Sequence, residues 1–268
     1  MFSFFNRTPR PKLIVTEDDK LWIEANLEWM MGQYGVRPLL LPPITAHKGP
    51  FAQFSDRIEK KLTYFMDNVC ERMDVDPDNV DLHLYTAGDD FGLDGPVMVR
   101  FEGGYSQGEY HHRNNLTGKF DIHINRKVIG NPQALFATMA HEVGHIKLLG
   151  EYRVTEDNDN HEYYTDLTAI YFGFGIFMAN TCNTRETWSD NKGYSGWAIG
   201  KQGYLPQQMI VYALAVQAYL QGRKDPEWAD QLDKIPRKMF KQSLLWLHET
   251  GDCDVRLPQA RGGRASDI

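Results

Sequence analysis

The sequence predicts an α+β protein. Its N-terminal half is expected to hold a small mixed or antiparallel sheet and two helices, and its C-terminal half to be a helical bundle. Apolar residues are spaced helically near the N-terminus, alternate with polar residues in the middle, and are spaced helically again after Pro132. The chain has 268 residues, of which 42% are hydrophobic and 24% charged, so it is long enough to bury a sizeable core.

Two helices are expected before the sheet. Thr16, with Asp19 three residues later, is typical of a helix N-cap, and helical spacing continues to Gly35. A proline-rich connector covers residues 38–50. The second helix is expected to begin near Ser55, because apolar residues again recur every three or four positions.

The middle of the chain has the alternation of strands and the later part has the spacing of helices. Three glycine-flanked segments are expected to be strands: Val80–Tyr85, Pro96–Phe101 and Phe120–Asn125. Helices are expected after them, over about 132–149, 161–180, 205–221 and 236–249.

A single domain is expected over residues 1–250. Its α+β lobe would cover about 12–130 and its helical lobe about 131–250, because the proline-rich connector is short and aromatic residues that can pack follow it. From Gly251 the sequence is polar and rich in glycine and arginine, so 251–268 is expected to be a disordered tail.

Charge and cysteine content exclude some classes of partner and site. The net charge is −7 and no dense run of lysine and arginine occurs, so nucleic acid is not an expected partner. The three cysteines, Cys70, Cys182 and Cys253, lie far apart and form no CxxC pair. This argues against a disulfide framework and against a thiolate zinc site.

The sequence also gives no sign of secretion or of a membrane span. The N-terminal run Met1–Phe5 meets Arg7 too soon to be the apolar core of a signal peptide. The longest apolar run, Leu167–Ala179, is shorter than the about 20 residues that a spanning helix needs. A cytoplasmic protein without a membrane partner is therefore expected.

The strongest chemical signal is the pattern HExxH in the expected helix over 132–149. His141 and His145 are four residues apart, so they share one face of a helix and can offer ring nitrogens to one Zn²⁺. Glu142 lies one position round the helix, which suits a general base that acts on a zinc-bound water. The motif therefore predicts one catalytic zinc ion.

A catalytic zinc site needs a third protein ligand, and the sequence offers two carboxylates for it. Glu151 follows His145 by six residues. Glu162 lies further on, four residues before Asp166, at the start of a strongly apolar helix. His161 is a weaker candidate, expected instead to face solvent at a helix start.

The segment of about 132–180 resembles the gluzincins, the thermolysin-like superfamily of zinc peptidases, and also bacterial HExxH proteins. Gluzincins follow HExxH with a helix that bears ExxxD. The resemblance implies a zincin-like fold, Glu162 as third ligand, and Asp166 as the partner of His141 behind the metal. Glu151 stands where metzincins place their third ligand, but the glycine that metzincins need three residues after the second histidine is Leu148 here.

The resemblance implies a metallopeptidase that acts on a peptide or protein substrate. It suggests that the strand Phe120–Asn125 is an edge strand that pairs with the substrate, and the alternative is that this strand is part of the sheet core. Gluzincins also use a downstream tyrosine or histidine to stabilise the oxyanion, and four residues could serve here: Tyr163, Tyr204, Tyr212 and His248. Two other functions stay open. One is a zinc-containing regulatory or partner-binding protein without turnover, and the other is a zinc hydrolase that acts on a non-peptide amide.

Overall fold

The computed structural model describes part of the chain at the level of individual residues. The described residues are 11–46, 48–49, 51, 61–86, 108–114, 116–155, 158, 160–189, 195–201 and 205–258. The expected strand Pro96–Phe101 and most of the glycines around it lie outside these ranges. Within them the chain is α+β, as the sequence predicts.

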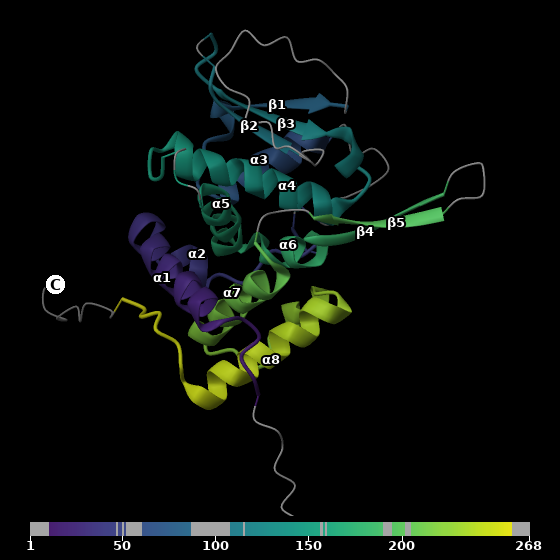
Figure 1. Cartoon of the computed structure of the whole chain (residues 1–268). Helices are drawn as coiled ribbons and strands as arrows, with labels where there is room; N and C mark the ends of the chain where they lie inside the picture. Colours follow the sequence, from purple (N-terminus) through teal and green to yellow (C-terminus); the bar gives the residue numbers. More distant parts are fainter. Residues whose placement is uncertain are drawn as a thin grey trace, which may run out of the picture.

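Along the chain, helices come first, the strands of the main sheet follow, and further helices come after them (Figure 1). Before and within the sheet they are α1 (Glu17–Tyr34), α2 (Arg37–Leu40), α3 (Leu62–Arg72), β1 (Val80–Tyr85), β2 (Gly108–Arg113) and β3 (Phe120–Asn125). After it come α4 (Pro132–His145), the π-turn η5 (Ile146–Gly150), α5 (His161–Ala169), the π-turn η6 (Ile170–Phe174), α6 (Gly175–Thr181), β4 (Asn183–Ser189), β5 (Ser195–Lys201), α7 (Gln207–Leu220) and α8 (Lys234–Thr250). Short 3₁₀ turns are η3 (Pro77–Asn79), η4 (Arg126–Val128) and η7 (Glu227–Gln231).

The main sheet is mixed, with strand order β1-β3-β2. β1 and β3 are parallel in a register that pairs Val80 with Phe120, and β2 is antiparallel to β3. Ile122 and Ile124 of β3 are fully buried, and α4 runs along this face of the sheet (Figure 1). The strands expected over 80–85 and 120–125 are thus confirmed with their bounds.

Two expectations about strands are wrong. β3 is the central strand, because both of its edges are hydrogen-bonded to β1 and β2. It therefore cannot be the open edge strand that the gluzincin resemblance suggested. In addition, the C-terminal half is not helical alone, since β4 and β5 pair as an antiparallel hairpin between α6 and α7.

The helical half is built around α7, which contacts α1, α6 and α8. The expected helix over 161–180 is interrupted in its middle, where Gly173 has φ 102°. Outside contacts satisfy the backbone there, since Phe172 O accepts from Arg72 Nε at 2.7 Å and Gly173 O accepts from the Ile44 N–H at 2.8 Å. A Cβ at position 173 would lie 2.7 Å from the Arg72 guanidinium, so glycine is required for both conformation and space.

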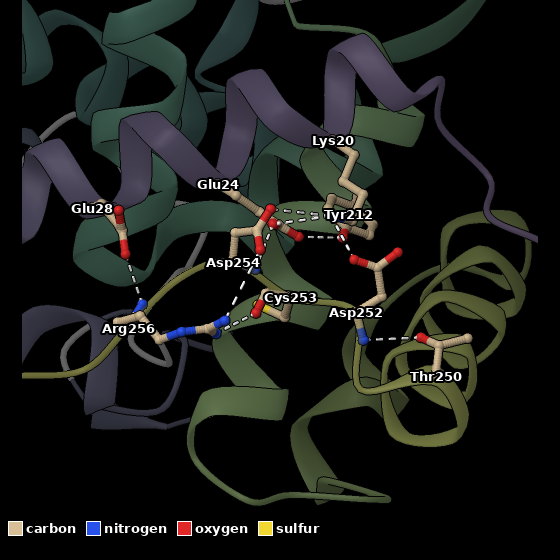
Figure 2. Close-up of polar contacts among 9 residues, drawn as sticks. All are labelled: Lys20, Glu24, Glu28, Tyr212, Thr250, Asp252, Cys253, Asp254 and Arg256. Carbon is tan, nitrogen blue, oxygen red and sulfur yellow. Dashed lines mark hydrogen bonds and ion pairs between the residues drawn. The ribbon is translucent and has the colours of Figure 1, made fainter.

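The C-terminal segment 251–258 packs against α1, so the expectation of a disordered tail from Gly251 is wrong for these residues. Cys253 and Val255 are each only 3% exposed. The backbone N–H groups of Asp254 and Arg256 donate to carboxylates of α1, as Figure 2 shows. Residues 259–268 lie outside the described ranges.

A buried polar network joins this segment to α1 and α7. Lys20 and Glu24 of α1 are 2% and 1% exposed and lie 3.2 Å apart, and Lys20 Nζ also reaches Asp252 at 3.1 Å. Tyr212 of α7 donates to the other oxygen of Glu24 at 2.6 Å (Figure 2). Each charge in the network therefore has a partner, which burial of charged groups requires. Among the described residues, no helix is long and apolar enough to cross a membrane.

Candidate metal centre

Helix α4 holds the two histidines of the HExxH motif on one face. It begins at an asparagine N-cap, where Asn131 Oδ1 accepts from the N–H groups of Gln133 and Ala134, and Pro132 occupies the first helical position. Because α4 lies between the sheet and the other helices, almost all of its side chains are buried. His141 and His145 fall on the last turns, and the chain then continues into the π-turn η5.

Helix α5 packs against α4 closely enough to bring its acidic residues to these histidines. The approach depends on Gly144 inside the motif. A Cβ at that position would lie 3.0 Å from Thr165 Cγ2 and 3.2 Å from Thr165 O. Glycine therefore sets the distance between the two helices, and Glu162 on the first turn of α5 comes to lie beside His141 and His145.

Three side-chain atoms meet in a small triangle. His141 Nε2 and His145 Nε2 lie 3.2 Å apart, and Glu162 Oε2 lies 3.2 Å from the first and 3.5 Å from the second. Zinc–ligand bonds of about 2.0–2.2 Å place tetrahedral ligand atoms about 3.3–3.6 Å apart. Glu162 Oε2 is buried without a hydrogen-bond partner, which is costly unless a cation or donor occupies the centre. The residues therefore fit a zinc ion.

The far sides of both imidazole rings are held by residues of α5. His141 Nδ1 lies 2.8 Å from Asp166 Oδ1, and the fully buried Asp166 also accepts from the Leu205 N–H at 2.8 Å. His145 Nδ1 lies 3.3 Å from Thr165 Oγ1, whose hydroxyl donates to the carbonyl of His161. Since the acceptors behind the rings favour a proton on each Nδ1, both Nε2 atoms are left with a lone pair that could coordinate a metal ion between them.

The charges of the cluster are strongly coupled in the absence of a metal. Burial lowers the pKa of His141, but the interactions with Asp166 and Glu162 outweigh it and raise that pKa well above its usual value. Burial raises the pKa of Glu162, but the interaction with His141 outweighs it and lowers that pKa to about 2. The two shifts are opposite in direction, as expected for a cation and an anion that stabilise each other.

Glu142 is 3% exposed and is not part of the ligand triangle. Its negative charge is close enough to His141 to help raise the pKa of that imidazole. Among the described residues, the group whose possible ligand atoms lie within 4.8 Å of one another is thus His141, His145 and Glu162, and Glu142 is outside it.

Glu151, the alternative third ligand, lies in a different set of contacts. Its Oε1 accepts from Lys147 Nζ at 2.7 Å and its Oε2 from Arg153 Nε at 2.9 Å. The π-helical segment η5 ends here, with the Glu151 N–H bonded to Ile146 O. The geometry thus favours Glu162 over Glu151.

None of the expected oxyanion donors that the structure describes lies at the triangle. Tyr212 is fully buried and donates to Glu24. Tyr163 packs edge-on against Trp22 of α1, with ring centroids 6.2 Å apart. His248 lies on α8 and contacts the carbonyl of Arg223. Tyr204 lies outside the described residues.

Two residues at the centre were not assigned a role from the sequence. Thr165 contacts His145, and His161 was expected to face solvent but lies 3.2 Å from Glu162 Oε1 through its Nε2. Their spacing was the available signal, because positions 161, 162, 165 and 166 share one face of a helix.

Comparisons of the chain with family models, with curated proteins and with solved structures give no match. The case for a metal centre therefore depends on the geometry of His141, His145 and Glu162 and on the contacts that surround them.

Proposed function

We propose that this chain is a zinc-dependent hydrolase, a metallopeptidase with a zincin-like catalytic domain. The observation that supports it best is the triangle of His141 Nε2, His145 Nε2 and Glu162 Oε2, with edges of 3.2–3.5 Å. Two imidazoles and one carboxylate are a common ligand set of catalytic zinc, and three protein ligands leave the fourth position open for water and substrate.

When bound, zinc supplies the Lewis acidity that brings the pKa of a coordinated water to about 7. The protein side chains do the rest. Glu142, buried beside His141, takes the proton from the water and can deliver it to the leaving amine. Asp166 and Thr165 hold the two imidazoles with their Nε2 atoms inward. Retention of Glu142 favours hydrolysis over simple metal storage, because a zinc-binding protein without turnover does not need this carboxylate.

The test combines metal analysis with a peptide-library cleavage screen at neutral pH. Wild type is expected to hold about one zinc per chain. The variant Glu142→Gln keeps shape and hydrogen bonding but removes the base, so it should keep its zinc and lose at least about 10²-fold in cleavage rate. Glu28→Gln, which changes a carboxylate on the outside of α1, is the matched control and should cleave like wild type.

Equal cleavage by wild type and Glu142→Gln would contradict the mechanism. If zinc is bound but wild type cleaves no peptide, the screen is repeated with non-peptide amides. If wild type cleaves neither substrate class and a partner protein co-purifies, the function is the zinc-containing regulatory one. If wild type neither carries nor takes up zinc, the proposal of a metal centre is wrong.

A further inference from the structure

The two carboxylate oxygens of Glu162 have different surroundings. Oε2 is buried without a hydrogen-bond partner and faces the Nε2 atoms of His141 and His145. Oε1 points to the other side, where His161 Nε2 lies 3.2 Å away. Only one oxygen of this carboxylate is therefore presented to the centre.

The ring of His161 is itself held in place. Its Nδ1 lies 3.0 Å from the carbonyl of Asn158, which also accepts from the His161 backbone N–H at 2.9 Å. The side chain is 18% exposed, so the ring is largely packed at the start of α5. His161 does not belong to the group of three potential ligands, since its Nε2 is turned to the outer oxygen of Glu162.

His161 also reaches the second histidine ligand through its backbone. The carbonyl of His161 accepts from Thr165 Oγ1 at 2.9 Å, and Thr165 Oγ1 itself lies 3.3 Å from His145 Nδ1. One residue at the start of α5 thus contacts one of the three possible ligands, Glu162, and the residue that supports another, His145.

We infer that His161 is a positioning residue that holds Glu162 as a one-oxygen ligand. A carboxylate can bind a metal through one or both oxygens, and a second oxygen would fill the position that a catalytic zinc keeps open. The contact with His161 occupies Oε1 and so opposes two-oxygen binding. This inference rests on the proposed metal centre and states how that centre keeps its fourth position free.

The experiment measures the metal and not the activity. Zinc affinity is determined by competition with a chromogenic chelator. The coordination number is determined from the visible absorption of the Co²⁺-loaded protein, because this absorption weakens when a four-coordinate ion gains a fifth ligand. The variants are His161→Ala and His161→Gln, because the amide of glutamine can replace the contact to Oε1. His248→Ala is the control, because this histidine lies on α8 and contacts Tyr219 of α7 and the carbonyl of Arg223.

For His161→Ala we expect zinc affinity lower by about 10–100-fold and weaker absorption of the Co²⁺ form. His161→Gln should restore most of both, and His248→Ala should match wild type. Melting curves of the zinc-free forms check folding. If His161→Ala does not fold, His161→Gln is compared with His161→Asn, whose side chain is too short to reach Oε1. His161→Asn should then show the lower zinc affinity and the weaker Co²⁺ absorption that are expected for His161→Ala.

Unchanged affinity and unchanged absorption in His161→Ala would overturn the inference while leaving the metal centre intact. A loss far beyond 100-fold, with the Co²⁺ spectrum of a site that has lost a nitrogen ligand, would overturn it too, because His161 would then be a ligand. If wild type binds neither Zn²⁺ nor Co²⁺, the proposed function itself has failed.

Discussion

Replacement of Asp166 by asparagine tests the metal centre through a residue that does not touch the metal. Asp166 is fully buried, and each of its oxygens accepts from a different donor at 2.8 Å: Oδ1 from His141 Nδ1 and Oδ2 from the Leu205 N–H. Asparagine has nearly the same shape but only one carbonyl oxygen. One of the two donors must therefore face an amide NH₂ in the variant.

The expected loss follows from these contacts. Removal of a carboxylate behind a ligating imidazole weakens metal affinity by about 10–100-fold, which corresponds to about 1.4–2.7 kcal/mol. The effect should apply here because the hydrogen bond that Asp166 accepts from His141 is the largest contribution that raises the pKa of His141, and it increases the basicity of that ring. The donor left without an acceptor should also lower the free energy of unfolding of the zinc-free protein by about 1–3 kcal/mol.

Zinc affinity is measured by chelator competition and zinc-free stability by urea unfolding. Asp121→Asn is the matched control, because Asp121 also contacts a histidine, His83 at 3.3 Å, but on the sheet away from α5. It should leave zinc affinity unchanged. Wild-type zinc affinity in Asp166→Asn would refute the reasoning that Asp166 supports a metal ligand.

Three further predictions concern stability. Glu24→Ala leaves Lys20 and Tyr212 without their buried acceptor, and it should lower the free energy of unfolding in urea by about 3–5 kcal/mol. The control Glu28→Ala loses one exposed hydrogen bond from Arg256 and should lower it by only about 0.5–1.5 kcal/mol. Equal losses would show that the buried network stabilises the fold no more than an exposed hydrogen bond does. Gly144→Ala should lower the free energy of unfolding by up to about 2 kcal/mol, because the cost of overpacking against Thr165 is about 1–3 kcal/mol and the gain in helix propensity is about 1 kcal/mol. Gly32→Ala has open space around it and should stabilise. A stabilising Gly144→Ala would mean that α4 and α5 are not in close contact. The zinc-free protein should lose stability as pH rises from about 6.5 through the raised pKa of His141, because a group with a raised pKa stabilises the fold only while it is protonated. It should also lose stability as pH falls from about 4.5 towards the lowered pKa of Glu162 near 2. Unfolding at several pH values, in the presence of chelator and in the presence of zinc, measures both effects, and a flat profile above pH 6.5 without zinc would contradict the coupling.

Local signals predicted the elements that local interactions form. Thr16 and Asp19 form the capping box expected for α1, and β1 and β3 have the bounds that alternation gave. The motif helix was also predictable, because its N-cap and its apolar positions lie within one segment. Glu162 and Asp166 could be chosen only through a resemblance, since nothing in their spacing from His145 shows that α5 packs on α4.

Features that depend on contacts between distant segments were missed. The place of β3 in the centre of the sheet depends on its pairing with β2, which the alternation of Phe120–Asn125 cannot show. The polar composition after Gly251 predicts a disordered tail, but Gly251 has φ 66° and ends α8 as a left-handed C-cap. The residues after it are ordered by Glu24, which is 230 positions away from Asp254 in the sequence.

One helix face accounts for most of the organisation of the proposed metal centre. His161, Glu162, Thr165 and Asp166 occupy two adjacent positions on each of two successive turns of α5, so all four side chains face α4. Each has a different contact: His161 with Oε1 of Glu162, Glu162 with both ligand nitrogens, Thr165 with His145, and Asp166 with His141. A rotation of α5 by one residue, about 100°, would remove all four contacts together. The packing of α5 against Gly144 therefore controls the ligand, its orientation and both imidazole supports at once, and a change that shifts α5 should abolish metal binding even where all three ligands are retained.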